Sequence, residues 1–280
     1  MLALALGAAP MAAAKPPIWI VRSKTATLVL FGSIHLLPAG LDWRPAALDD
    51  ALARADEVWF ELPIDAATDN RAANAAIARG ALPRGRSLFA MLGPDEAARL
   101  TREGGALNCP PQALDRMQPW MADLTLSVAS DARAGASAFD GVEDQIQAVT
   151  PAATRRRAFE GPEQQIDFLA GAPVKDQIAS LDWTMDEIDN DPGSYQRVVD
   201  EWMAADTAGL ERDALAPLQK VSPTLFDRLL GNRNRAWAKV LTKRMRHGGQ
   251  IVVVVGVGHM LGPGGLPALL RADGLDVEGP

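Results

Sequence analysis

The sequence is poor in several residue types, and each shortage excludes a class of protein. Cys109 is the single cysteine among 280 residues, so an internal disulfide and a cysteine-based zinc site are both excluded. Lysine and arginine form no block, and the formal net charge is −7, which argues against nucleic acid or an anionic membrane surface as a partner. With 48% hydrophobic and 22% charged residues, the chain has the composition of a globular protein.

The first residues differ from the rest of the chain. Residues 1–14 (MLALALGAAPMAAA) carry no charged side chain and end in three alanines. This pattern is typical of the apolar and cleavage regions of a secretory signal peptide, here without the usual basic start, so we expect a truncated signal peptide. A membrane-spanning helix needs ~20 apolar residues, and neither this segment nor the later run 251–255 reaches that length. We therefore expect a periplasmic or secreted protein without an integral membrane segment.

The N-terminal part has the pattern of an α/β fold. Apolar runs at 18–22 and 27–31, separated by a short polar stretch, predict a β-hairpin. Residues 45–54 have helical periodicity, and residues 57–63 form an apolar run that ends in proline, which predicts a third strand. A helix between two apolar strands implies a right-handed crossover and a parallel pair.

The middle of the chain, from about residue 65 to residue 222, is rich in alanine and mostly helical in period, with one stretch at 156–160 that suggests a buried strand. The C-terminal part returns to an α/β pattern. Its expected elements are a long helix over 224–247, a central parallel strand over 251–255, a short helix over 264–272 and an edge strand over 275–277. We therefore predict a mostly parallel central sheet built from N- and C-terminal segments, with a large helical insertion at about 65–222.

Two of the three histidines occupy matched positions. His35 ends TLVLF-GSIH and His259 ends IVVVV-GVGH, so each follows an apolar strand and a glycine. Ligands bind outside the carboxyl ends of parallel strands, and neighbouring strands would bring both imidazoles to one crevice. Glu61 ends the strand between them in sequence. Two imidazoles and one carboxylate suit a zinc, manganese or cobalt ion, and without a metal the same trio could act as general acid and base. The third histidine, His247, is expected only to complement a helix dipole.

At this point a family resemblance is visible. The motifs that carry it are LVLFGSIHLLP, ALDDALARADEVWFELP, ALDRMQPWMADL, FEGPEQQIDFL, LLGNRNRAWAKVL and VVVVGVGHMLGPGGLPALLRADGLDV. Together they resemble the TraB/GumN family, which is related to the Tiki proteases and the plasmid pheromone-shutdown proteins. The resemblance implies one domain over residues 15–280 with a fold like that of erythromycin-esterase and ChaN-type (EreA/ChaN-like) proteins. It also implies metal-dependent peptidase activity, with manganese or cobalt as the suggested ion.

Carried over residue by residue, the resemblance implies a complete site. Arg233 would stabilise developing oxyanion charge, and Asn234 and Glu160 would orient neighbouring groups. The implied metal ligands are His35, His259 and Glu61, with Glu61 as third ligand or general base. We therefore expect a metal-dependent, peptidase-like hydrolase acting on a peptide or small-molecule substrate.

Two alternatives stay open at this stage, and so does the oligomeric state. The same crevice could hold a metal, a haem-like ligand or a peptide without turnover. It could also carry out esterase-like hydrolysis without a metal, which would survive treatment with a chelator.

Overall fold

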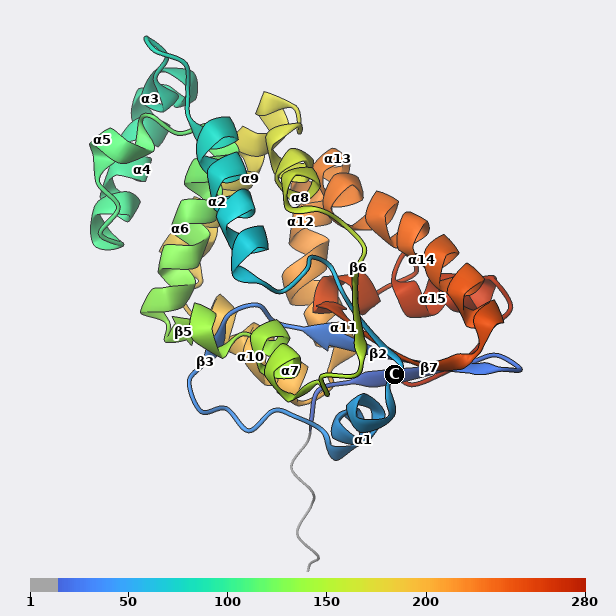
Figure 1. Cartoon of the computed structure of the whole chain (residues 1–280). Helices are drawn as coiled ribbons and strands as arrows, with labels where there is room; N and C mark the ends of the chain where they lie inside the picture. Colours follow the sequence, from blue (N-terminus) through green and yellow to red (C-terminus); the bar gives the residue numbers. More distant parts are fainter. Residues whose placement is uncertain (1–14) are drawn as a thin grey trace, which may run out of the picture.

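A six-stranded sheet lies at the centre of the computed structural model, which describes residues 15–280 (Figure 1). The expected signal peptide therefore lies outside the described residues. The strand order is β6-β4-β7-β2-β1-β8. The strands are β1 (Ile18–Arg22), β2 (Ala26–Ser33), β4 (Glu57–Phe60), β6 (Arg155–Ala158), β7 (Gly249–Gly256) and β8 (Asp276–Glu278). The four strands from β6 to β2 are parallel to one another, and β1 pairs antiparallel with both of its neighbours, β2 and β8. This confirms the predicted mostly parallel α/β fold.

Strand β7, from the C-terminal part of the sequence, lies between two strands from the N-terminal part. It pairs in parallel with β2 on one side, where Val253 lies opposite Leu30, and with β4 on the other, where Val253 lies opposite Trp59. The prediction that the strands before and after the first helix form a direct pair is wrong, because β7 lies between β2 and β4. A continuous β-branched run such as Ile251–Val255 is stable where both faces of a strand are buried, and the centre of the sheet offers that environment.

Helices cover both faces of the sheet. On one face the core contains side chains of α1 (Ala46–Arg54), α7 (Val142–Val149) and α10 (Ser194–Met203), with Trp202 fully buried among them. On the other face the core contains side chains of α14 (Asn232–Arg244) and α15 (Leu266–Ala272). The sheet is thus buried on both sides, as parallel sheets are.

The central part of the chain is a large helical region with a core of its own (Figure 1). Its further helices are α2 (Ala66–Gly80), α3 (Leu88–Leu92), α4 (Pro94–Ala106), α5 (Pro111–Leu114), α6 (Pro119–Arg133), α8 (Pro162–Ala170), α9 (Val174–Asn190), α11 (Thr207–Leu210), α12 (Ala216–Val221) and the π-helical turn η2 (Glu211–Leu215). Strand β6 leaves this region to pair with β4. The segment predicted as a buried strand at 156–160 does contain a strand, but the prediction that it is buried is wrong. Arg155 to Arg157 are exposed, because β6 is an edge strand.

The expected long helix over 224–247 is helical but irregular. It consists of α13 (Pro223–Phe226), a π-helical turn η3 (Asp227–Gly231), α14 (Asn232–Arg244) and a 3-10 turn η4 (Met245–His247). A π turn inserts one residue into a helix and so rotates everything that follows it. Here the residues that follow are Arg233 and Asn234.

The remaining short elements are the β3 (Leu37–Pro38) and β5 (Ala136–Ser137) pair and the 3-10 turns η1 (Ala138–Asp140) and η5 (Val257–Met260). Among residues 15–280, no helix combines the length and the apolar character needed to cross a membrane.

Candidate functional site

Three parallel strands end side by side, and each delivers one of the predicted residues. Glu61 directly follows β4, His35 follows β2, and His259 lies in the turn after β7. They meet over Gly256. A Cβ placed on this glycine would lie 3.2 Å from Glu61 Oε1, 3.5 Å from His35 Nε2 and 3.8 Å from His259 Cδ2. The structure therefore brings the three predicted side chains together, in a space that stays open because residue 256 has no side chain.

Arg233 is the hub of the site. Its Nε and Nη2 donate to the two oxygens of Glu160, both at 2.8 Å, and Nη2 also donates to Glu61 Oε2 at 2.5 Å. Its Nη1 donates to the carbonyl of Leu229 at 2.8 Å and lies 3.2 Å from His259 Nε2. A guanidinium has five N–H groups, and these contacts use all of them. The expected oxyanion role of Arg233 stays a prediction.

The charges of this network are buried. Glu61, Glu160 and Arg233 are each 7% exposed, and His259 is 3% exposed. Burial alone would raise the pKa of Glu61, but His259, Arg233, His35 and the Gly256 amide outweigh it and lower that pKa to about 2. Burial raises the pKa of Glu160, against the hydrogen bonds from Arg233. Two carboxylates share one guanidinium, so the buried network is negative when both are ionised.

A short hydrogen-bond chain sets the tautomer of His259. Asn234 Nδ2 donates to the carbonyl of Gly264 at 2.9 Å, so Asn234 Oδ1 faces the imidazole and accepts from His259 Nδ1 at 2.5 Å. The proton of the neutral ring is therefore on Nδ1, and the lone pair of Nε2 points to Arg233 and to Glu61 Oε1, 3.6 Å away. Burial lowers the pKa of His259 to about 3, with Glu61 opposing and Arg233 and His35 reinforcing the shift.

His35 has a different environment, because 62% of its side chain is exposed. Its Nδ1 pairs with Glu143 Oε1 at 2.8 Å, and Ser33 Oγ donates to the same oxygen at 2.5 Å. The negative charge of Glu143 raises the pKa of His35, and solvent over the exposed ring weakens this effect. His35 is thus the solvent-facing member of the site.

Two further side chains belong to the site and were not predicted. Glu143, at the start of α7, orients His35, and Gln165 on α8 donates to Glu61 Oε2 at 3.1 Å. Neither lies in a motif at a strand end. Gln165 does lie in the motif FEGPEQQIDFL, which gave it no role, and Glu143 lies in the first turn of a helix, where a carboxylate is common for dipole reasons alone.

The side chains over Gly256 include nitrogen and oxygen donors of the kinds that bind divalent ions. Among residues 15–280, no three His, Cys, Asp or Glu side chains are arranged as a metal-binding group. His259 Nε2 and Glu61 Oε1 are nevertheless 3.6 Å apart with lone pairs toward one gap, as suits two ligands each about 2.0–2.2 Å from one ion. His35 Nε2 faces the same gap over Gly256. The donor types therefore suit a divalent ion, but in the part of the chain that the structure describes they are not arranged around one, and Arg233 Nη1 contacts the same nitrogen at 3.2 Å.

Comparison of the sequence with known proteins identifies one family. The model of the TraB/PrgY/gumN family matches residues 17–279. The chain belongs to this family. It is also similar to the uncharacterized protein YbaP of Escherichia coli (strain K12), with 27% identity over 243 residues, covering 86% of this chain and 87% of YbaP. YbaP of Shigella flexneri gives the same identity and coverage. No solved structure matches the chain significantly.

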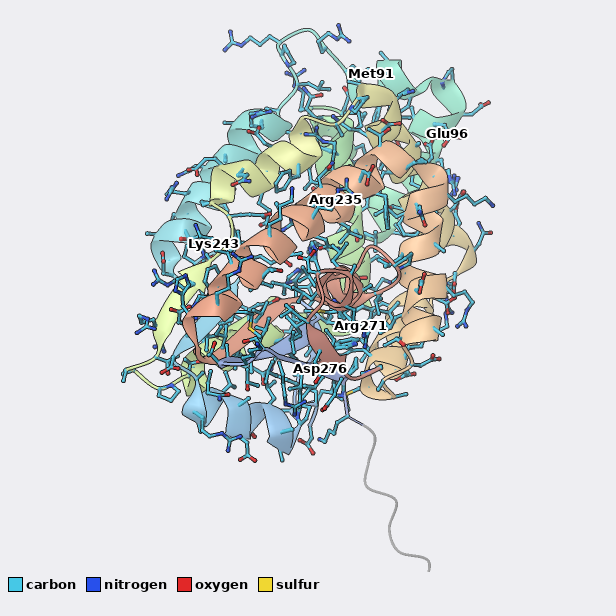
Figure 2. The ribbon with its side chains drawn as sticks, turned by 90° about the vertical axis from the view of Figure 1, so that its right-hand side faces the viewer. Met91, Glu96, Arg235, Lys243, Arg271 and Asp276 are labelled. Carbon is cyan, nitrogen blue, oxygen red and sulfur yellow. The ribbon has the colours of Figure 1, made fainter. Side chains whose placement is uncertain are left out.

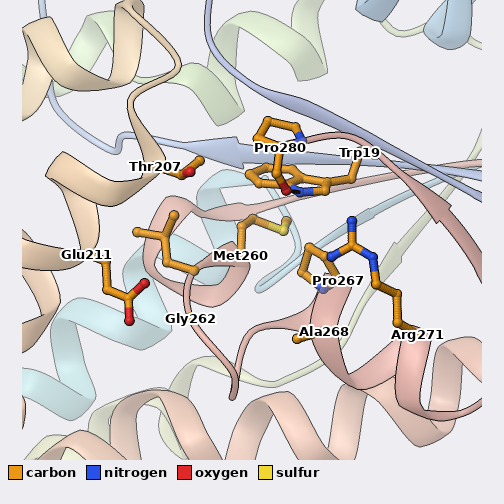
Figure 3. A pocket seen from close by; sticks show the side chains of 10 residues that line it. Trp19, Thr207, Glu211, Met260, Gly262, Pro267, Ala268, Arg271 and Pro280 are labelled. Atoms are coloured by element: carbon orange, nitrogen blue, oxygen red, sulfur yellow. Dashed lines mark hydrogen bonds between the residues drawn. The ribbon is translucent and has the colours of Figure 1, made fainter.

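Two cavities flank the site of this family member. The larger, of about 390 Å³, borders Arg233 and Glu160. The smaller, of about 100 Å³, lies behind the turn that carries His259, where Met260 points toward Trp19 and Arg271 (Figure 3). Arg235 lies on the outer side of α14, away from both (Figure 2).

Gly256→Ala should crowd the site without changing its polar groups. The new Cβ would lie 3.2 Å from Glu61 Oε1, so the carboxylate must shift by a few tenths of an ångström, which strains the hydrogen bond that it accepts from the Gly256 amide at 2.8 Å. We expect the free energy of unfolding, measured by urea titration, to fall by about 1–3 kcal/mol. Gly105→Ala is the control, because a Cβ there meets nothing within 4 Å. Equal stability of the two variants would contradict the expectation that a Cβ at position 256 crowds Glu61.

Acid should destabilise the metal-free protein through His259. Its pKa is about 3 in the fold and about 6.5 when unfolded, so its contribution is complete above pH 6.5 and is lost as the pH falls toward 3. Between pH 6.5 and 5 this amounts to about 2 kcal/mol. Glu61 adds to the loss below about pH 4.5. His35 has the opposite sign: its contribution is present below pH 6.5 and is lost as the pH rises through its raised pKa.

Urea titrations at pH 7 and pH 5 on wild type and His259→Ala measure this effect. The wild type should lose more stability than the variant on acidification. An NMR titration gives a second measurement, in which the His259 ring signal should not move between pH 7 and 5. A His259 signal that titrates near pH 6.5 would contradict the prediction.

Proposed function

We propose that this protein is a metal-dependent, peptidase-like hydrolase, periplasmic or secreted, in which His35, His259 and Glu61 hold a manganese, cobalt or zinc ion. The observation that supports this most is the lone pair of His259 Nε2, which Asn234 directs toward Glu61 Oε1 at 3.6 Å inside a buried negative network. Neutral imidazole and ionised carboxylate are the forms that bind divalent ions.

A bound ion would supply Lewis-acid chemistry that lowers the pKa of a water molecule. The chain's own residues have separate tasks. Asn234 keeps the His259 proton on Nδ1, and Arg233 and Gln165 hold Glu61 Oε2 so that Oε1 faces the gap. Glu61 has a pKa of about 2, so it stays ionised at neutral pH, which suits a ligand better than a general base.

Metal loading and hydrolysis test the proposal together. The full chain is stripped with a chelator, reloaded with Mn²⁺, Co²⁺ or Zn²⁺, desalted and analysed by mass spectrometry for bound metal. The same samples are incubated with a peptide library. We expect one of the ions to bind and to restore hydrolysis in the wild type and in the control His247→Ala, and neither result in His259→Ala. A wild type that binds no more metal than His259→Ala would overturn the proposal.

One observation favours a second candidate, hydrolysis without a metal. Arg233 Nη1 lies 3.2 Å from His259 Nε2 and so can satisfy the lone pair that an ion would need. Hydrolysis that persists after chelation and depends on His259 would support this candidate. A ligand retained through purification with no hydrolysis of any peptide would instead indicate a binding protein.

A further inference from the structure

The cavity of about 390 Å³ beside the site has four aromatic residues in its lining. It lies between the edge strand β6, helix α8 and helix α14. Trp59 and Phe159 line it from the sheet, Phe168 from α8 and Trp237 from α14. Its volume falls in the range of ~300–1,000 Å³ that small-ligand pockets have. It is large enough for one bulky side chain and part of the attached backbone.

The rings form one continuous row that ends at the candidate site. The Trp59 and Phe159 centroids are 5.0 Å apart, and those of Phe159 and Trp237 are 4.7 Å apart with the planes inclined by 18°. Trp237 then contacts the His259 ring at 4.4 Å. His259 does not itself line the cavity, so a group bound against Trp237 is one ring away from the imidazole, and the same packing that orients His259 shapes the cavity wall.

The polar end of the cavity is shared with the site. Arg233 and Glu160 line the cavity and also belong to the buried network around Glu61. All N–H groups of Arg233 are engaged, whereas the Glu160 carboxylate, with about four lone-pair sites, accepts one bond from Arg233 on each oxygen and a further one from Trp237. This end can therefore accept an N–H group, and the negative charge of the network disfavours an acidic ligand.

We propose that this cavity binds one side chain of a peptide substrate. The side chain is aromatic or large and aliphatic, and Glu160 accepts a hydrogen bond from the backbone N–H of the same residue. The assignment rests on the proposed hydrolase function, because it names the substrate class of the same site. Burial of such a side chain contributes about 1.5–3 kcal/mol, so a phenylalanine ligand should bind about 10–150-fold more tightly than the alanine analogue.

Binding of N-acetyl amino acid amides tests the pocket without requiring hydrolysis. Calorimetry or ligand-observed NMR compares the phenylalanine, leucine, alanine and aspartate amides on the full chain. We expect the order phenylalanine, leucine, alanine, with aspartate weakest. Ala236→Phe places a ring in the cavity and should weaken phenylalanine amide binding at least about tenfold. Lys239→Phe, on the same helix but outside the cavity lining, is the matched control and should bind like the wild type.

The proposed pocket would be overturned by equal affinity for the phenylalanine and alanine amides. It would also be overturned if Ala236→Phe and Lys239→Phe bound the phenylalanine amide equally well. The outcomes also separate the two proposals. Hydrolysis of library peptides without preference for bulky apolar residues contradicts the pocket alone. Selective amide binding with no hydrolysis of any peptide contradicts the proposed hydrolase function alone.

Discussion

Arg233→Met should lower the free energy of unfolding at pH 7 by about 3–5 kcal/mol, because it leaves Glu61 and Glu160 buried without a partner. Methionine keeps the aliphatic stem but lacks the guanidinium carbon, which lies 5.1 Å from the Phe168 ring centroid and 4.7 Å from that of Trp237, so the loss of these two contacts adds to the effect. Urea titration measures the loss. The variant should also respond to pH in the opposite direction from the wild type. Its unpaired carboxylates have raised pKa values, so its deficit should grow as the pH rises above about 4.5.

Arg235→Met is the control for Arg233→Met. The Arg235 side chain is 54% exposed and lies 3.5 Å from Asp227, an ion pair that is mostly in solvent. Exposed pairs contribute about 0–1 kcal/mol, so the control should stay close to the wild type. Two variants of equal stability would show that the buried network does not depend on its guanidinium.

Glu61→Gln should abolish most of the hydrolytic activity, by about 10²–10⁴-fold, with the fold intact. The two oxygens of Glu61 face donors from Arg233, Gln165 and Gly256. A glutamine must turn its NH₂ group toward one of these donors, and it no longer carries the charge that faces His259. Steady-state kinetics on the best library peptide and circular dichroism of the same samples separate activity from folding.

Glu163→Gln is the matched control, because Glu163 is exposed on α8 and pairs only with Arg71 among its described contacts. It should retain wild-type kinetics. Activity of Glu61→Gln equal to that of this control would remove Glu61 from the chemistry and leave it a structural role.

The sheet could be predicted from the sequence because its strands have strong local signals. The run Ile251–Val255 is a central parallel strand, and the first two strands are a hairpin, as their composition indicates. The neighbours of each strand could not be predicted with the same success. Local pattern says that β2 and β4 are apolar, but only the global packing decides that β7 lies between them.

The candidate site could likewise be predicted only in part. Strand-end positions predicted that His35, Glu61 and His259 would converge, since parallel strands deliver their C-terminal residues to one edge. Glu143 and Gln165 come from helices, and the orientation of a helix over a sheet depends on packing across its whole length. The full engagement of Arg233 was hidden for the same reason, because its side-chain partners Glu61, Glu160 and His259 lie on three segments of the chain outside α14.

The position of β7 has a consequence for synthesis on the ribosome. β2 and β4 emerge early, but the strand that separates them is formed by residues 249–256, near the end of the chain. Contacts between residues so far apart slow folding, and apolar strands without partners promote aggregation meanwhile. Glu61 and Glu160 also leave the ribosome well before Arg233, which neutralises their mutual repulsion. The nascent chain should therefore depend on chaperones until β7 is released.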